Sequence, residues 1–161
     1  MSVLIQGDQM RALLMGVRVN KAAAVLPATT TGTLFTVSGG RVLVTALIGE
    51  VTTVFDGTVN SLNITHDPTV GAVGDLCAAT VCTSDAAGTL YSITGVAADL
   101  LSAQKVTGTE VPTHVFVQAF QTKGIVLPAG TLGLKTTGTD TTGATKWTLT
   151  YIPIDDGASV A

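Results

Sequence analysis

The sequence predicts an all-β protein: an antiparallel β-sandwich or jelly-roll-like domain with an extended N-terminal arm and at most one short helix. Only 12% of the residues are charged and 46% are hydrophobic, so the strong helix formers Glu, Lys and Arg are scarce. The apolar runs are rich in Val and Thr, which suit a half-buried pleated surface. Turn formers are abundant, with 18 Gly and 5 Pro. The chain of 161 residues has the size of one domain, which we expect at residues 33–161 after an arm and linker at 1–32.

The predicted arm carries an apolar cluster, which consists of Met10, Leu13, Leu14 and Met15. Gly7 and Gly16 bracket this cluster closely, which favours an extended segment over one or two helical turns. Residues 21–33 surround Pro27 with Ala and Thr and predict a linker without a regular element. The four apolar side chains would be exposed unless they dock on the domain or on a neighbouring subunit. They are therefore the candidate partner contacts.

Glycine-punctuated β runs predict the strands of the first half of the domain, at residues 33–37, 41–48, 51–55, 58–65, 75–84 and 89–94. The runs 41–48 and 51–55 could also form one long bent strand. Asp56-Gly57 predicts a type I′ hairpin that pairs residues 51–55 with 58–65. Asp85 to Gly88 predicts a second hairpin, between 75–84 and 89–94. His66-Asp67-Pro68 is expected to form a loop in which Asp67 caps local amides.

The second half predicts one short helix followed by further strands. Residues 97–105 favour the helix because they contain good helix formers and end in Lys105, which suits the helix dipole. Strands are predicted at 114–121, 125–127, 131–136 and 146–152. In the last of these, Trp147, Leu149 and Tyr151 alternate with outward side chains, so we expect these three to anchor the core. The total of nine or ten strands is typical of a sandwich.

Two short segments echo each other, Val25-Leu26-Pro27-Ala28 and Val126-Leu127-Pro128-Ala129. Each precedes a strand that begins with Gly or Thr, so a Pro-directed turn that feeds a strand accounts for the likeness without a duplication. Residues 136–144 are rich in Thr and Gly and predict an exposed loop, either a solvated tip or a contact loop.

The two cysteines, Cys77 and Cys82, are spaced too widely for a Cys-x-x-Cys redox or zinc pair. We expect both to be reduced. If they share one strand, their odd separation sends the two side chains to opposite faces.

The sequence contains no convergent catalytic or metal-binding pattern. His66-Asp67 is the only local pairing of histidine with a carboxylate, and the loop interpretation explains it better than a metal site. No Gly-x-Ser-x-Gly motif is present, and nothing brings Glu50, Glu110 and His114 together. We therefore predict that the protein is not an enzyme and has no catalytic residue, metal or cofactor.

The charge pattern also excludes some partners. A net charge of −3 with eight scattered basic residues does not favour nucleic acid. No apolar run approaches the roughly 20 residues that span a bilayer, so no membrane is predicted. Low charge with positive hydropathy favours association, so a homo-oligomer is expected.

Taken together, three stretches resemble small β-rich structural proteins of tailed-bacteriophage particles, most of all capsid decoration or head cement proteins. These stretches are residues 34–42, 127–131 and 146–157. The resemblance implies a homotrimer on the outer capsid surface of the virion, assembled in the host cytoplasm. In that role the arm would clamp neighbouring subunits of the major capsid protein. The alternative is a head or tail appendage or fibre module that binds host surface glycan through loops, although aromatic residues, at 4%, are scarce.

Overall fold

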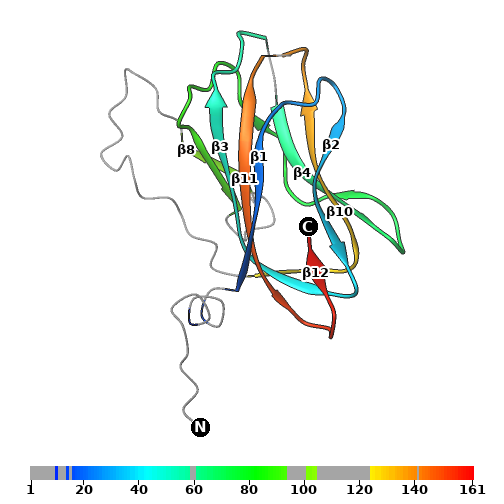
Figure 1. Ribbon diagram of the computed structural model, residues 1–161. Coiled ribbons are helices and arrows are strands. Elements are labelled where there is room, and N and C mark those ends of the chain that lie inside the picture. The colour runs from blue at the N-terminus through cyan, green and yellow to red at the C-terminus, as the bar shows by residue number, and fades with distance from the viewer. Residues whose placement is uncertain are drawn as a thin grey trace.

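The computed structural model describes residues 10, 14, 16–58, 61–93, 101–104, 124–140 and 142–161. In these ranges twelve strands form two sheets that pack face to face, which confirms the predicted antiparallel β-sandwich (Figure 1). The first sheet has the order β1-β11-β3-β7-β8, and β9 also pairs with β3. The second has the order β12-β2-β10-β4-β5, and β6 also pairs with β4. Every strand pairing between the described strands is antiparallel.

The strands of the first sheet are β1 (Val17–Val25), β3 (Val42–Thr53), β7 (Leu90–Ile93), β8 (Leu101–Gln104), β9 (Ile125–Leu127) and β11 (Ala144–Pro153). Those of the second sheet are β2 (Thr31–Ser38), β4 (Ser61–Pro68), β5 (Gly74–Asp75), β6 (Thr80–Val81), β10 (Gly130–Thr137) and β12 (Ser159–Val160).

The core lies between the sheets, and β11 is its best example. Trp147, Leu149 and Tyr151 are buried, while the residues between them face outward, so the alternation predicted from the sequence is present. Trp147 stacks on Tyr91 of β7, with ring centroids 6.4 Å apart. Across the sheet, Trp147 is in register with Gly49 of β3, whose missing side chain leaves room for the indole. Close packing of this kind makes the interior sensitive to small changes of volume.

The sandwich begins earlier than the predicted boundary at residue 33. Residues 17–25 form β1, which pairs with β11 along the edge of the first sheet, and β2 begins at Thr31. The expectation of a linker without regular structure at 21–33 is therefore wrong. Ala and Thr tolerate a strand where a neighbouring strand supplies the hydrogen bonds, so local propensity alone did not reveal it.

Both predicted hairpins are wrong, because each joins strands of different sheets. β3 belongs to the first sheet and β4 to the second, and Asp56-Gly57 lies in the crossing between them. The Asp56 carboxylate accepts the amide of Thr58 at 2.8 Å, while buried Phe55 holds the crossing against the core. Asp85 to Gly88 likewise leads from β6 in the second sheet to β7 in the first.

The predicted helix at 97–105 is contradicted where the chain is described. Leu101–Gln104 forms β8 and pairs with β7. An exposed edge of a sheet offers hydrogen bonds to an added strand, and here that outweighs modest helix propensity. Residues 97–100 and Lys105, like the strand predicted at 114–121, lie outside the described residues.

The two cysteines are buried, and neither forms a disulfide. The expectation of reduced thiols is confirmed. The strand expected at 75–84 is reduced to the short β5 and β6, neither of which contains a cysteine, so the two thiols do not alternate along one strand and both lie in the core. Cys77 lies against β4, where its sulfur accepts the amide of Ile64 at 3.1 Å. Burial raises the pKa of the Cys77 thiol, which keeps it protonated.

The first four strands, β1 to β4, and the last four, β9 to β12, pair in equivalent ways. β1 pairs with β11 as β9 pairs with β3, and β4 pairs with β10 as β12 pairs with β2. The two Val-Leu-Pro-Ala segments occupy matching places, because each carries the chain from the first sheet to the second, into β2 and β10. Leu26 and Leu127 are both buried there. The predicted Pro-directed turns are confirmed.

Two aspartates tie the loops at the ends of the sandwich. Asp140, in the loop between β10 and β11, is 2% exposed and accepts the amide of Asp56 at 2.8 Å. The expectation that 136–144 is simply an exposed loop is therefore wrong at Asp140. Asp155, after β11, accepts the amide of Arg41 at 2.7 Å and holds the guanidinium of the same residue in a bidentate pair.

The pair of Arg41 and Asp155 predicts a stability loss in acid. The Arg41 side-chain and backbone hydrogen bonds lower the pKa of Asp155 from 3.8 to about 2. The pKa of Asp155 is lower in the folded state than in the unfolded state. Its contribution to the free energy of unfolding is therefore complete above the unfolded-state pKa and is lost as the pH falls through the folded-state pKa. In thermal melts across this pH range, the melting temperature of Asp155→Asn is expected to fall less with decreasing pH than that of the unchanged protein. Asp156→Asn is the matched control, and equal effects of the two substitutions would contradict the prediction.

Candidate functional site

The outer face of the second sheet is polar along three neighbouring strands. On β4, Thr65 and Asp67 alternate with the buried Ile64 and His66. The same alternation on β10 turns Thr131, Gly133 and Lys135 outward while Leu132 and Leu134 enter the core. β2 adds Thr31 and Thr33. The register β2-β10-β4 brings these side chains together on one surface.

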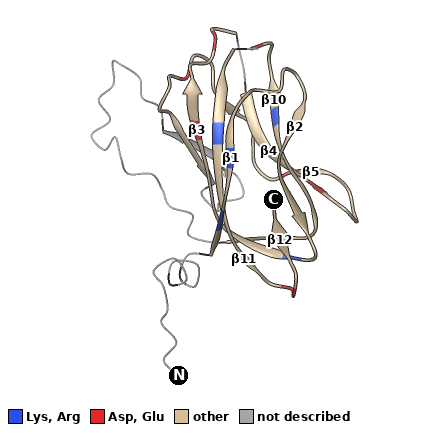
Figure 2. Cartoon of the chain, viewed as in Figure 1, with Lys and Arg blue, Asp and Glu red and all other residues tan. Residues whose placement is uncertain are grey.

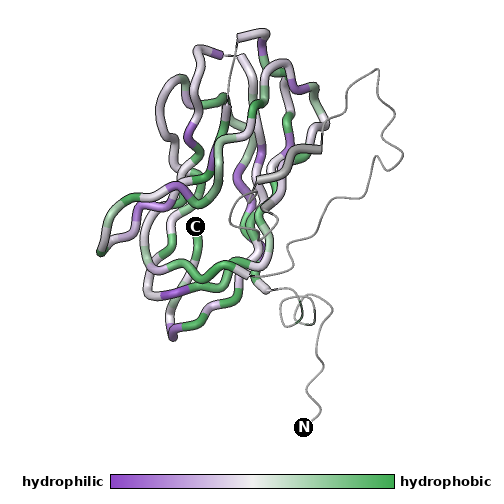
Figure 3. The backbone as a smooth tube through the Cα atoms, turned by 180° about the vertical axis from the view of Figure 1, so that it is seen from behind, coloured by the Kyte–Doolittle hydropathy of each residue, from purple (hydrophilic) through white to green (hydrophobic). Residues whose placement is uncertain are grey.

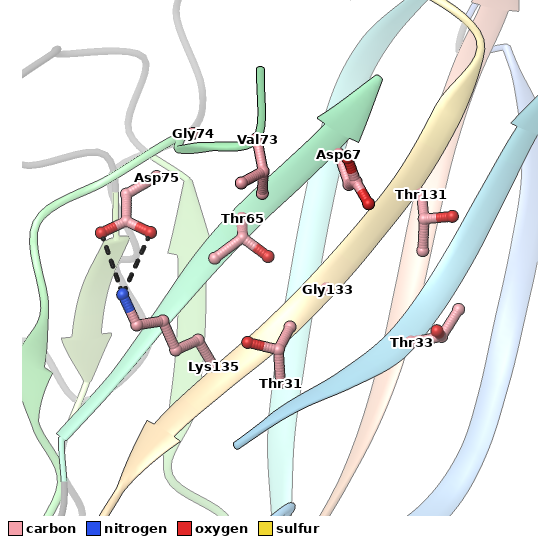
Figure 4. Close-up of a pocket in the computed structure, with 10 residues that line it drawn as sticks. All are labelled: Thr31, Thr33, Thr65, Asp67, Val73, Gly74, Asp75, Thr131, Gly133 and Lys135. Carbon is pink, nitrogen blue, oxygen red and sulfur yellow. Dashed lines mark hydrogen bonds and ion pairs between the residues drawn. The ribbon is translucent and has the colours of Figure 1, made fainter. Parts of the chain in front are cut away.

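This surface contains an open groove of about 680 Å³ (Figure 4). Its lining comprises Thr31, Thr33, Thr65, Asp67, Val73, Gly74, Asp75, Thr131, Gly133 and Lys135. The chain between β4 and β5 projects from the body of the sandwich (Figures 1 and 3). As it returns, Val73 to Asp75 form one wall, held by the pairing of β5 with β4.

Gly133 forms part of the groove's floor, between two threonines of the neighbouring strands. A Cβ at this position would lie 2.5 Å from Cγ2 of Thr31 and 2.6 Å from Oγ1 of Thr65. Contacts this short require a shift, so the glycine allows the two threonines to approach across β10. Thr65 is only 5% exposed although it lines the groove.

Charged groups are sparse over the molecule, and three of them lie in this groove (Figure 2). The Lys135 ammonium lies 3.4 and 3.5 Å from the two carboxylate oxygens of Asp75. Both side chains are about half exposed, so this ion pair contributes little to stability. With Asp67 included, the groove carries two carboxylates against one ammonium.

His66 and Asp67 do not form the predicted loop pair. Both lie on β4, where successive side chains point to opposite faces, so His66 is buried and Asp67 is exposed. Burial lowers the pKa of His66, while a hydrogen bond to the Pro128 carbonyl opposes the shift. The described part of the chain contains no group of three or more His, Cys, Asp or Glu side chains that could hold a metal ion.

The predicted partner contacts are only partly described. Met10 and Leu14 are helical, so the expectation of an extended segment is wrong at these two positions; they are 48% and 78% exposed. Leu13 and Met15 lie outside the described residues. Of the residues weighed for catalysis, Glu50 forms an ion pair with Lys146 at 2.9 Å on the outer face of the first sheet. Glu110 and His114 lie outside the described residues.

The groove is not evident from the amino-acid sequence alone. Polar residues at every second position, as in Thr65-x-Asp67 and Thr131-x-Gly133-x-Lys135, do indicate an outward polar face. The pairing of β10 with both β2 and β4 joins segments that are roughly 60 to 100 residues apart along the chain. A periodicity within one strand contains no information about that pairing.

No family model matches the chain, and no curated protein is similar to it. Among solved structures, a chain titled "Structure of infectious bursal disease virus Gx strain" aligns with 89% of this chain at 13% sequence identity and a TM-score of 0.23. The alignment covers 33% of the viral chain, so this chain spans about a third of the length of the viral chain. A TM-score of this size does not establish a common fold. In the described residues, no helix is long and apolar enough to cross a membrane.

Proposed function

We propose that the chain is a non-enzymatic structural protein of a virus particle, which decorates a tailed-phage capsid as a homotrimer and bridges subunits of the major capsid protein. One observation carries this proposal: the exposed edge strand β1 directly follows an N-terminal segment with exposed apolar side chains. The resemblance of residues 34–42, 127–131 and 146–157 to decoration proteins supports it.

β1 is well suited to contact a partner. It is the terminal strand of the first sheet, and eight of its nine residues are exposed. Soluble proteins usually protect a long sheet edge with charges, prolines or bulges. Here the edge has one bulge and only two charged residues, Arg18 and Lys21, while Val17 and Val25 are exposed. Such an edge gains from burial against another subunit.

The segment before β1 supplies apolar anchors. Met10 and Leu14 are exposed, and burying each of them fully on a partner would contribute about 1.5–3 kcal/mol. Three such arms on one trimer would bind with the avidity of linked sites.

The decisive experiment combines localisation with binding. Immunogold labelling of virions from the phage that encodes the chain is expected to mark the capsid. Label on the tail would favour the appendage alternative, and unlabelled virions would overturn a virion role.

Particle binding then tests the arm. Deletion of residues 2–15 leaves β1 intact and is expected to weaken co-sedimentation with particles stripped of this protein by at least about tenfold, since two or more anchors are lost. The double substitution Met10→Ser/Leu14→Ser should weaken binding in the same direction. Val81→Ser removes a comparably exposed apolar side chain on β6 and is the matched control. Undiminished binding of the deletion variant would refute the clamp.

A further inference from the structure

We propose that the groove on the second sheet is a binding site for a neutral, polyhydroxylated ligand of the class of a short oligosaccharide. The inference goes beyond the proposed virion role and does not depend on it, because it rests on a different face of the molecule from β1.

The shape of the groove suits such a ligand. Its volume of about 680 Å³ is within the range of small-molecule sites. The groove is open to solvent along one side, and the return from the projecting segment to β5 forms a wall on the other. An open groove with one wall can hold two or three sugar rings while the rest of a longer chain continues outside.

The lining matches the hydrogen-bonding chemistry of sugars. Four threonine hydroxyls, from Thr31, Thr33, Thr65 and Thr131, can each donate and accept a hydrogen bond, as each sugar hydroxyl can. The Asp67 carboxylate can accept from sugar hydroxyls, and such charge-assisted bonds are about twice as strong as neutral ones. Figure 4 shows these polar groups around one space above Gly133.

Apolar contact comes from aliphatic groups. Val73 is 65% exposed on the wall, and it can cover a C–H face of a sugar ring together with the threonine methyl groups. Among the residues that the structure describes, no aromatic side chain lines the groove, so these residues do not provide the stacking energy of many sugar sites. The expected affinity is therefore modest, with a Kd of about 1 mM for a disaccharide.

The charges select against acidic ligands. Asp67 and Asp75 outnumber Lys135, so a phosphate, sulfate or carboxylate on the ligand would meet a net negative groove. The ion pair of Lys135 with Asp75 is long and exposed, and opening it to let both groups bind sugar hydroxyls costs little.

A surface that is merely solvated explains this lining less well. The floor consists of threonines around a glycine, so several hydroxyls lie beside the space that the missing side chain leaves. Thr65 is nearly buried yet borders the groove, which gives the floor a fixed hydroxyl. Fixed polar groups lose little entropy when a ligand binds.

The test is an NMR titration of the full ¹⁵N-labelled chain with maltose, lactose, chitobiose and mannobiose, after a glycan array has ranked neutral and acidic oligosaccharides. Saturable shifts are expected at the amides of Thr65, Gly74 and Gly133. Thr65→Val keeps the side-chain volume and is expected to weaken binding about fivefold, and Asp67→Ala about tenfold. Thr36→Val, on the same strand as Thr31 and exposed outside the groove, is the matched control and should bind normally.

Three results would overturn the proposal: no saturable response to any of the four sugars, binding that neither Thr65→Val nor Asp67→Ala weakens, or tighter binding of acidic than of neutral oligosaccharides. Thermal melting of each variant checks that a loss of binding does not come from unfolding. If the Thr65→Val variant still co-sediments with particles, sugar binding in the groove is independent of particle binding by the arm.

Discussion

Gly49→Ala is expected to destabilise the sandwich by about 2–3 kcal/mol, a large effect for the addition of one methyl group. The new Cβ would lie 2.6 to 2.8 Å from three atoms of the Trp147 ring. The indole is 1% exposed and stacks on Tyr91, so a shift away from the new methyl group would disturb packing in the core. Gly49 does not adopt a positive φ, so the cost comes from packing and not from the backbone. Urea unfolding followed by far-UV circular dichroism measures it.

A double-mutant cycle identifies the cause. In a Trp147→Leu background the ring is absent, so the added cost of Gly49→Ala should fall by more than about 1 kcal/mol. Gly57→Ala is the matched control, because nothing lies within 4 Å of a Cβ there and its φ is not positive. If Gly49→Ala were as mild as Gly57→Ala, or if the cycle showed no coupling, the packing explanation would be wrong.

Asp140→Ala is expected to cost about 3 kcal/mol, because it removes the acceptor for four hydrogen bonds at a buried position. The carboxylate accepts the backbone amides of Asp56, Thr142 and Gly143 at 2.7 to 2.9 Å and the Thr142 hydroxyl at 2.9 Å. These donors connect the loop between β10 and β11 to the crossing after β3. Without Asp140 the buried amide of Gly143 and the half-buried amide of Asp56 would lose their acceptor at this end of the sandwich.

The same carboxylate predicts a pH dependence. Burial acts to raise the pKa of Asp140, but the hydrogen bonds from Gly143, Thr142 and Asp56 outweigh it and lower the pKa. The folded-state pKa is therefore below the unfolded one, so this contribution is present at neutral pH and is lost as the pH falls through the folded pKa. Asp140→Asn should lower stability at neutral pH and remove this part of the acid loss. Thr139→Ala, at an exposed neighbouring position, is the control. A stability of Asp140→Ala equal to that of Thr139→Ala would contradict the assigned role.

The fold class and β11 could be predicted from sequence because one residue in two of that strand is buried. Trp147, Leu149 and Tyr151 are buried at every second position, so the burial is visible in the sequence as an alternation of large apolar residues with other residues. The pairing partners could not be predicted in the same way. Asp56-Gly57 is a strong local turn signal, yet its flanking strands belong to different sheets. The burial of Phe55 and the hydrogen bond from the Asp56 amide to the distant Asp140 fix the crossing. Local signals specify a turn but not the sheet that receives the next strand.

The groove shows the same limit. The outward polarity of Thr65 and Asp67 is evident in the sequence, but their neighbours on β2 and β10 depend on register across distant segments. β1 was missed for a related reason. Apart from the half-buried Val19, its residues are exposed on both faces, so burial imposes little alternation there, and mainly the backbone hydrogen bonds to β11 define it as a strand.

The pairing of the first strands with the last ones affects how the chain folds during synthesis. β1 pairs with β11, and β2 pairs with β10 and β12, so the partners of the first two strands are synthesised roughly 90 to 135 residues after them. Loop closure over such separations has a high entropic cost before contacts can compensate, and topologies dominated by distant pairings fold slowly. The N-terminal strands therefore wait with unpaired edges, the interval in which nascent chains are most prone to aggregate.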